Sequence, residues 1–284
     1  MDLTSPRTIR NIQEQFGFTF KKGLGQNFLT ARNILEEIVD AAEIESGVIE
    51  VGPGFGVLTS ELAQNSDKVV TIEIDERLID VLDYTLAEYD NVKIINEDIL
   101  KLDLKKVIDD EFNGEKVSIA ANLPYYITTP IITKLLEEKL PIKNIVVMVQ
   151  KEVAERMSAK PSTKDYGAIT VLCQYYTEPS IVVNVPASLF VPPPKVDSAV
   201  LKLKVLDKPS VEVKDEGVFF RVVKAAFSQR RKTLLNCLSA NFPIPKDEIS
   251  TLLESIGIAP SRRGETLSLE EFANIADTLL QKIK

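Results

Sequence analysis

Histidine is absent from all 284 residues of the chain. The chain therefore lacks the side chain that most often serves as a general base and most often binds metals. We accordingly expect no catalytic zinc site, and any proton transfer must use other groups. Cysteine is scarce as well: Cys173 and Cys237 are the only two, and they form no Cys-x-x-Cys pair. This excludes a disulfide framework and fits a reducing compartment.

Long apolar runs are also missing. No uncharged stretch approaches the ~20 residues that a membrane-spanning helix needs, and the polar N-terminus lacks the apolar core of a signal peptide. With 44% hydrophobic and 27% charged residues, the composition is that of an ordinary globular protein. We therefore expect a soluble, cytoplasmic protein, and its length suits one large domain and one small one.

An excess of basic residues is missing too, because the net charge is −8. This balance argues mildly against a nucleic-acid partner. The charge is uneven, however: residues 1–206 carry 22 basic and 31 acidic side chains, whereas residues 207–284 carry 12 and 11. Local clusters such as Lys21-Lys22 and Arg230-Arg231-Lys232 can therefore contact phosphates, although most clusters of this kind are simply solvated.

Short apolar runs alternate with helical patterns over most of the chain. The predicted strands are Val48–Val51, Lys68–Ile74, Val92–Ile95, Val117–Ala121 and Asn144–Val149. The predicted helices among them are Ala31–Ile44, Val57–Asn65, Glu76–Ala87 and Thr129–Glu138. Such alternation is typical of a mainly parallel sheet with helices on both faces.

The later part of the chain follows a different pattern. After a predicted helix at Tyr166–Tyr176, two strand-like runs, Ser180–Val185 and Ser198–Val205, suit an antiparallel edge of the sheet. From there on the pattern is helical: Glu216–Gln229, Thr233–Ala240, Asp247–Ile256 and Ser268–Ile283. We therefore predict a doubly wound α/β domain over 1–206, with a flexible arm at about 1–30, and a small all-α domain over 207–284.

A glycine-rich turn follows the first predicted strand. Gly52 and Gly54 lie in Glu50-Val51-Gly52-Pro53-Gly54-Phe55-Gly56, where glycine lets the backbone approach a ligand closely. Glu73 ends the next strand, 21 residues after Gly52, where an acid typically binds ribose hydroxyls. The pair predicts a nucleoside-containing cofactor, and a plain structural turn is the alternative. Asp98, after the third strand, either accepts a hydrogen bond from the cofactor's adenine or caps a helix.

The segment Asn122-Leu123-Pro124-Tyr125 follows the fourth predicted strand. Ligands of open α/β sheets bind beyond the carboxyl ends of the strands, so this segment should face the cofactor. The Asn122 side-chain carbonyl and the Pro124 backbone carbonyl suit the two N–H bonds of an adenine amino group, which frees the nitrogen lone pair for attack on a sulfonium methyl. Tyr125 offers a face on which a base can stack. With an activated methyl donor, orientation replaces a strong base.

Five motifs together resemble those of the ribosomal RNA adenine dimethyltransferases. They are Gly25-Gln26-Asn27-Phe28-Leu29, Glu50-Val51-Gly52-Pro53-Gly54, Asn122-Leu123-Pro124-Tyr125, Gln150-Lys151-Glu152-Val153 and Phe190-Val191-Pro192-Pro193-Pro194-Lys195-Val196-Asp197-Ser198. The resemblance runs from about Lys22 to the final helix, and Phe227-Ser228-Gln229-Arg230-Arg231-Lys232-Thr233 is similar to the bacterial small-subunit branch. It implies a class I, Rossmann-like methyltransferase that uses S-adenosylmethionine to dimethylate two adjacent adenines in the last hairpin of small-subunit rRNA, with a role in ribosome biogenesis.

The resemblance also assigns roles to residues. The implied contacts to S-adenosylmethionine are Asn27, Leu29, Gly52, Gly54, Glu73, Asp98 and Asn122. The implied catalytic residues are Asn122, Leu123, Pro124, Tyr125 and Phe190. Of these, Tyr125 and Phe190 would sandwich the target base. Without the resemblance, Phe190 beside three prolines is more simply a core residue next to a stiff connector. The residues expected to bind RNA are Lys21, Lys22, Lys195, Arg230, Arg231 and Lys232.

Other functions stay open at this point. One alternative is a ribosome-assembly checkpoint that binds immature subunits, with methylation secondary. A second is methylation of large-subunit rRNA, whose enzymes usually carry isoleucine at the position of Leu123. A nicotinamide dehydrogenase is disfavoured by the G-x-G-x-G spacing and by the lack of histidine. The expected partner is small-subunit rRNA, as an assembled or immature subunit, bound by a monomer.

Overall fold

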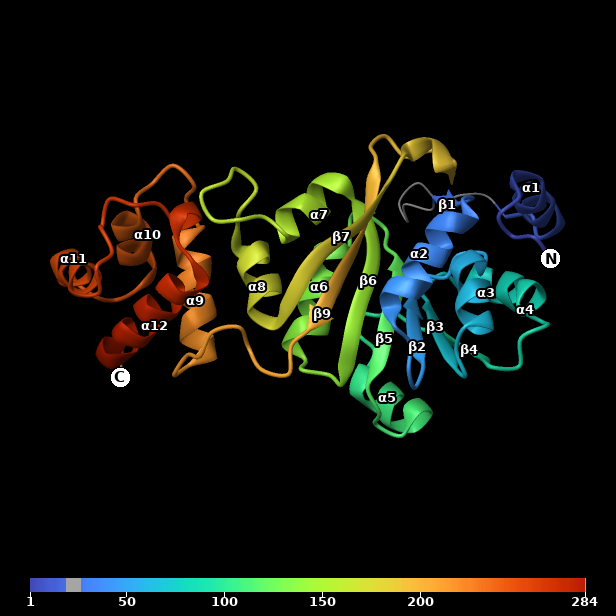
Figure 1. Ribbon diagram of the computed structural model, residues 1–284, viewed down its shortest axis with the longest axis horizontal. Helices are drawn as coiled ribbons and strands as arrows, with labels where there is room; N and C mark the ends of the chain where they lie inside the picture. Colours follow the sequence, from blue (N-terminus) through green and yellow to red (C-terminus); the bar gives the residue numbers. More distant parts are fainter. Residues whose placement is uncertain (19–26, 284) are drawn as a thin grey trace. The chain divides into compact units, whose positions relative to one another are not determined.

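A computed structural model describes residues 1–18 and 27–283 (Figure 1). The chain packs into two compact units. They are a first unit of Met1–Ala154 with Glu178–Val205, and a second unit of Glu155–Thr177 with Leu206–Lys284. The packing therefore groups residues 155–177 with the helical unit, whereas the sequence predicted a division into 1–206 and 207–284.

Aromatic packing explains why residues 155–177 join the helical unit. Helix α8 (Ala168–Tyr176) presents Tyr175, whose ring stacks on Phe219 of α9 (Glu216–Ala226) with centroids 4.8 Å apart. Tyr176 stacks on the neighbouring Phe220. The partners lie more than forty residues apart, so the apolar pattern of either helix alone does not reveal this grouping.

A seven-stranded sheet forms the centre of the first unit (Figure 1). In sheet order its strands are β4 (Val92–Asn96), β3 (Val69–Glu73), β2 (Val48–Val51), β5 (Val117–Asn122), β6 (Ile142–Gln150), β9 (Ser198–Val205) and β7 (Thr177–Val185). Strands β2 to β6 pair in parallel, and β9 pairs antiparallel with β6. The predicted doubly wound sheet with an antiparallel edge is thus confirmed.

Helices pack on this sheet and bury its inner strands. Helix α2 (Arg32–Ala42) contacts β5 and β6, α3 (Val57–Gln64) contacts β3, and α4 (Ile79–Thr85) contacts β4. Every residue of β2 and β3 is buried, which is why both strands read as nearly continuous apolar runs. The remaining helices of this part of the chain are η2 (Glu76–Leu78), α5 (Leu104–Phe112), α6 (Thr128–Glu137) and α7 (Lys151–Met157).

The described part of the N-terminal arm is folded onto the first unit. Helix α1 (Pro6–Gln15) buries Ile9 and Ile12 in the core of that unit. Phe18 packs edge-on against Phe55 with centroids 5.3 Å apart. Within the arm that was predicted to be flexible, Leu3, Ile9, Ile12 and Phe18 are thus buried.

Two short strands join distant parts of the first unit. Strand β1 (Phe28–Leu29) pairs antiparallel with β8 (Phe190–Val191), so that Leu29 lies opposite Phe190. A turn of 3-10 helix, η3 (Ala187–Leu189), leads directly into β8. The Thr30 backbone N–H donates a further hydrogen bond of 2.9 Å to the Leu189 carbonyl.

The second unit is helical, as predicted. After α8 and α9 come α10 (Leu234–Asn241), α11 (Lys246–Ser255), η4 (Gly264–Thr266) and α12 (Leu269–Ile283). Helix α9 packs against both α10 and α12. Among the residues that the structure describes, no helix has the length and apolar character to cross a membrane.

Candidate functional site

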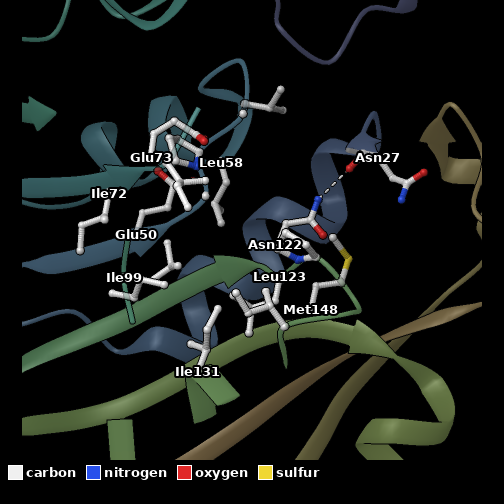
Figure 2. A pocket seen from close by; sticks show the side chains of 18 of the residues that line it. Asn27, Glu50, Leu58, Ile72, Glu73, Ile99, Asn122, Leu123, Ile131 and Met148 are labelled. Atoms are coloured by element: carbon white, nitrogen blue, oxygen red, sulfur yellow. Dashed lines mark hydrogen bonds between the residues drawn. The ribbon is translucent and has the colours of Figure 1, made fainter. Parts of the chain in front are cut away.

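A cavity opens beyond the carboxyl ends of β2, β3, β4 and β5 (Figure 2). Strand β2 lies between β3 and β5 in the sheet, so the chain crosses over to opposite sides of β2 and leaves a crevice at this point. All seven residues of the predicted cofactor set line this cavity: Asn27, Leu29, Gly52, Gly54, Glu73, Asp98 and Asn122. Leu123, Pro124 and Tyr125 line it as well. The fold therefore brings together all of the predicted cofactor-binding residues and every predicted catalytic residue except Phe190.

The turn after β2 has a backbone that only glycine adopts easily. Gly52 has φ +70°, and a Cβ built on it would meet nothing within 4 Å, so its open side is free for a ligand. Gly54 has φ +59°, and its Cβ would stand 2.6 Å from the ring of Phe28. That ring itself stacks on Phe55 with centroids 4.3 Å apart. A side chain at either position would strain the turn, and at Gly54 it would also displace the wall that β1 supplies.

Glu73 stands at the end of β3 with its carboxylate in the cavity wall. It is 6% exposed, and its Oε1 accepts a hydrogen bond of 2.8 Å from the Asp75 backbone N–H. Burial raises the pKa of Glu73 to about 6, partly opposed by hydrogen bonds from backbone N–H groups. The carboxylate is therefore mainly ionised at neutral pH, which makes it a strong acceptor for hydroxyl groups.

A second buried acid, Glu50, was not predicted as a site residue. It occupies the third position of β2, is 1% exposed and lines the same cavity. Its Oε2 accepts a 2.5 Å hydrogen bond from the Thr59 hydroxyl. Burial raises the pKa of Glu50 to about 8, and the nearby charge of Glu73 acts in the same direction. The one sequence signal for it is an acid inside an otherwise apolar strand.

This raised pKa makes the stability of the protein pH-dependent. The folded state binds a proton at Glu50 that the unfolded state releases above its ordinary pKa near 4.5, so stability is lost as pH rises from there through about 8. We expect Glu50→Gln to remove this loss. Thermal unfolding of Glu50→Gln and of the parent at pH 5 and pH 8 should show the variant gaining relative stability at pH 8.

An exposed acid of α2, Glu36, provides the control for this comparison. Glu36→Gln should shift the unfolding temperature by the same small amount at both pH values, because the side chain is exposed. If the curves of Glu50→Gln and the parent stay parallel between pH 5 and pH 8, Glu50 does not titrate in that range.

Asp98 caps a turn rather than a helix, and its predicted contact to the cofactor's adenine stays a prediction. Its Oδ1 accepts a 3.0 Å hydrogen bond from the Leu100 backbone N–H, which caps the turn after β4. The residue also lines the cavity. Its Oδ2 lies 3.9 Å from the Lys101 ammonium, a loose ion pair. The cap fixes where the carboxylate stands and leaves one oxygen for a ligand.

Asn122 ends β5, and its amide is held in one orientation. The Nδ2 group donates a 3.0 Å hydrogen bond to the backbone carbonyl of Asn27 (Figure 2). Because a carbonyl only accepts, the nitrogen must face Asn27, and the Oδ1 must face the other way. Within the described residues, the Oδ1 accepts no hydrogen bond. The Asn122 Oδ1 is therefore a hydrogen-bond acceptor in a fixed position at the cavity, held there by the end of β5 and by the Asn27 carbonyl.

The structure corrects the role predicted for Pro124. Its carbonyl already accepts hydrogen bonds from the Ile127 backbone N–H at 3.1 Å and from the Thr128 hydroxyl at 3.3 Å. Both lone pairs are therefore used by the turn that starts α6. The Leu123 carbonyl, one residue earlier, accepts no hydrogen bond from the part of the chain that is described. Leu123 itself is held by its N–H, which donates to the Met148 carbonyl at 3.1 Å.

Tyr125 lies in the cavity wall, but Phe190 does not. The Tyr125 ring is half-buried, and its hydroxyl lies 2.7 Å from the Ser198 hydroxyl. Phe190 is 3% exposed and packs in the hydrophobic core, where β8 pairs with β1. This burial fits the simpler interpretation of Phe190 as a core residue, and the sandwich of the base by Phe190 stays a prediction.

The basic residues predicted to bind RNA fall into four groups. Lys21 and Lys22 lie outside the described residues. Lys195 is exposed next to the prolines that follow β8. Arg230 is already engaged within the second unit: its guanidinium donates to the Lys164 carbonyl and lies 3.6 Å from the Glu265 carboxylate. Arg231 and Lys232 are exposed, and no ion pair engages them within the described residues.

Two exposed apolar residues at the cavity were not predicted. Ile74 follows Glu73 and is 53% exposed, and Tyr126 follows Tyr125 and is 58% exposed. Large apolar groups that face solvent beside a cavity suit stacking against flat ligands. In the sequence, the signal for both was adjacency to a predicted site residue after a strand end.

The chain matches a known protein family over most of its length. The profile of the family described as "Ribosomal RNA adenine dimethylase" matches residues 17–281. The chain is 54% identical to proteins from Bacillus mycoides and Bacillus cereus named "Ribosomal RNA small subunit methyltransferase A", over 98% of this chain and 98% of each relative.

Two solved structures are similar over most of the chain. A dimethyladenosine transferase from Plasmodium falciparum superposes with a TM-score of 0.72 at 30% identity, covering 87% of this chain and 95% of that one. The 23S rRNA methyltransferase ErmE superposes with a TM-score of 0.67 at 27% identity, covering 89% of this chain and all of that one (100%). The similarity extends through the sheet and the helical region that follows it.

Proposed function

Because the chain belongs to the ribosomal RNA adenine dimethylase family and is an S-adenosylmethionine-dependent rRNA adenine dimethyltransferase, we propose that its substrate is the rRNA of the small ribosomal subunit. The observation that carries this proposal is the 54% identity, over nearly the full length, to relatives named for the small subunit. Identity to the large-subunit enzyme ErmE is 27%. The nicotinamide dehydrogenase alternative is excluded by family membership.

Within that rRNA, the target is two adjacent adenines of the last hairpin, methylated at N6. The bacterial small-subunit motif around Arg230-Arg231-Lys232 supports this choice. The leucine at position 123, where large-subunit enzymes usually carry isoleucine, also supports it. The enzyme acts as a monomer in the cytoplasm, and a partly assembled subunit is its substrate rather than naked rRNA.

The cavity fits S-adenosylmethionine by the chemistry of its donors and acceptors. The open side of Gly52 leaves room for the backbone to approach the cofactor. The ionised carboxylate of Glu73 suits the ribose hydroxyls, and the Oδ2 of Asp98, which only a loose ion pair engages, suits the adenine amino group. Asn27, Leu29 and Gly54 supply the wall that faces these groups. When bound, the cofactor supplies a methyl group activated by its sulfonium charge.

The residues after β5 orient the target adenine. The Asn122 Oδ1 and the Leu123 carbonyl accept the two N–H bonds of the exocyclic amino group, which draws the nitrogen away from planar geometry and exposes its lone pair. Tyr125 stacks on the flipped base, a contact worth ~1–3 kcal/mol. The target must leave its own stack to reach these groups. Orientation and charge placement carry the reaction, which agrees with the absence of histidine.

The second unit binds the rRNA backbone through Arg231 and Lys232. Arg230 acts differently, because its contacts to the Lys164 carbonyl and the Glu265 carboxylate hold two loops of that unit together. Exposed cations without intramolecular partners are the ones that displace counterions when they meet phosphates. Two of the three cations therefore bind RNA, and the third is a structural residue.

Salt dependence tests this division of roles. We expect Arg231→Ala/Lys232→Ala to weaken binding to small subunits and to lower the slope of log affinity against log salt by ~0.7–0.9 for each phosphate that is no longer neutralised. The matched control is Lys208→Ala/Lys246→Ala, which removes two other exposed cations of the unit and should leave the slope unchanged. Equal slopes for both double variants and the parent would show that Arg231 and Lys232 do not bind the RNA backbone. Arg230→Ala should instead lower the unfolding temperature.

The choice of substrate is tested by offering the enzyme several acceptors. Undermethylated small subunits, large subunits and naked small-subunit rRNA are each incubated with labelled methyl donor. We expect label in the small subunits and little in the other two. Label in the large subunits would favour the large-subunit alternative. The assembly-checkpoint role gains support if Asn122→Ala still binds immature subunits and corrects their assembly without methylating them.

A further inference from the structure

We propose that Ser198 is a positioning residue, whose hydroxyl holds the far end of the Tyr125 side chain and so fixes where the ring lies for the target adenine. This inference rests on the proposed function, in which Tyr125 stacks on the base. Ser198 is fully buried at the start of β9, and its Oγ lies 2.7 Å from the Tyr125 hydroxyl. A buried hydroxyl needs a hydrogen-bond partner. Here the partner is Tyr125, in the loop of residues 123–127 between β5 and α6, called the catalytic loop below.

Both sides of this hydrogen bond are tied to strand β6. Ser198 pairs with Gln150 in the antiparallel register of β9 and β6. The loop that holds Tyr125 is anchored by the Leu123 N–H, which donates to the Met148 carbonyl. The bond between the two hydroxyls therefore spans two segments whose backbones are already fixed. It restrains the direction in which the ring points away from the backbone, because it holds the far end of the tyrosine side chain in place.

Asp197 joins three segments at the same place. Its backbone carbonyl accepts a 3.0 Å hydrogen bond from the Lys151 N–H, at the start of α7. Its carboxylate accepts a 2.9 Å hydrogen bond from the Ala187 N–H, at the start of η3. Asp197 thus connects the beginning of β9 with the turn that leads into β8.

The contacts continue from η3 to Asn122. Strand β8 pairs with β1, and the Thr30 N–H and hydroxyl both donate to the Leu189 carbonyl, at 2.9 and 2.8 Å. Strand β1 begins directly after Asn27, whose carbonyl holds the Asn122 amide. Asn122 at the end of β5 and Tyr125 three residues later are therefore each held by other segments, and those segments are joined to one another.

This arrangement matters because the reaction depends on geometry. A misplacement on the order of 1 Å in a site of this kind can cost about a hundredfold in rate. Burial raises the pKa of Tyr125, and the charge of Asp197 adds to that effect, so the hydroxyl stays protonated and able to donate. The hydroxyl is occupied by Ser198 and has no direct part in the chemistry. Its effect on the reaction comes through the orientation of the ring.

A double-mutant cycle tests the proposal. The variants are Ser198→Ala, Tyr125→Phe and the double variant, assayed in single turnovers with undermethylated small subunits. We expect each single variant to lower the rate at saturating substrate by about three- to tenfold, as for the loss of one hydrogen bond. The double variant should be no slower than the slower single one, because both remove the same bond. Affinities for S-adenosylmethionine and for subunits should change by less than about twofold.

A matched control separates positioning from stability. Ser118→Ala removes another buried serine hydroxyl, which lies near the start of β5 and donates a 2.6 Å hydrogen bond to the Ala42 carbonyl. It should lower the unfolding temperature and leave the single-turnover rate unchanged, because the catalytic loop follows the other end of that strand. If Ser198→Ala is too unstable to assay, Tyr125→Phe probes the same bond from its other end.

The outcomes distinguish this inference from the proposed function. Parent-like rates for Ser198→Ala and Tyr125→Phe, or fully additive losses, would overturn the positioning role. If Tyr125→Ala still loses most of the activity, the stacking role of the ring stands without the anchor. If Tyr125→Ala also methylates normally, the stacking part of the proposed function fails as well.

Discussion

Replacing Asn122 by alanine is expected to lower the single-turnover rate of methyl transfer by about two to three orders of magnitude, the loss that follows removal of one preorganised polar group at a reacting centre. The Asn122 Oδ1 is held toward the cavity because the Nδ2 donates to the Asn27 carbonyl. The proposed interaction with the amino group strengthens as the nitrogen changes geometry, so it acts mainly in the transition state. Rapid-quench assays with small subunits measure this rate.

Cofactor binding provides the internal control for that result. S-adenosylmethionine affinity of Asn122→Ala should fall far less than the rate, because most of the proposed cofactor contacts come from β2, β3 and β4. Asn91→Ala serves as a matched control, since that amide bonds to backbone carbonyls of Ala63 and Ser66 and does not line the cavity. Turnover by Asn122→Ala within a few fold of the parent would end the proposed mechanism.

Replacing Glu73 by alanine is expected to weaken S-adenosylmethionine binding by ~1–3 kcal/mol, the range for losing a charge-assisted acceptor. Glu73 is buried, and one oxygen is already held by the Asp75 N–H, so the carboxylate needs no reordering to accept ribose hydroxyls. The pKa of about 6 predicts a further effect of pH. Affinity should fall as pH drops below about 6, because protonation removes the charge.

Calorimetric titration measures both effects. Glu73→Gln should lose affinity and should also lose the pH dependence between pH 5 and 7. Glu76→Ala removes an exposed acid three residues later that does not line the cavity, and it should bind like the parent. Unchanged affinity in a folded Glu73→Ala variant would contradict the assignment of Glu73 to the cofactor.

Most of the sheet could be predicted from the sequence because its strands are buried and short. The bounds of β2 and β9 were predicted to the residue, since apolar runs begin and end sharply there. Helix α5 was missed, although Asp103 caps it and Leu104, Val107 and Ile108 follow helical spacing. The pairing of β1 with β8 joins two-residue segments far apart in the chain. No local pattern encodes a contact of that kind.

The site was predictable where one residue type is needed at a strand end. The glycines after β2, Glu73 and Asn122 were found because a turn, an acid and an amide follow buried strands. The hydrogen bonds of Pro124 and the burial of Phe190 were not, because each depends on what else the group contacts. The sequence does not show whether a carbonyl accepts hydrogen bonds within its own turn. It does not show either whether the pairing of two short strands buries a ring. The contacts of Arg230 were not visible in the sequence either, since its partners Lys164 and Glu265 lie in other segments of the chain.

One measurement tests the central claim most directly: mapping the nucleotides that receive label when the enzyme meets undermethylated small subunits and labelled methyl donor. We predict label at N6 of two adjacent adenines in the last hairpin of the small-subunit rRNA, with dimethyladenosine as the final product. The Asn122→Ala variant should leave both positions unlabelled over the same period. Label at other nucleotides, at another atom of adenine or only in large-subunit rRNA would contradict the proposed function.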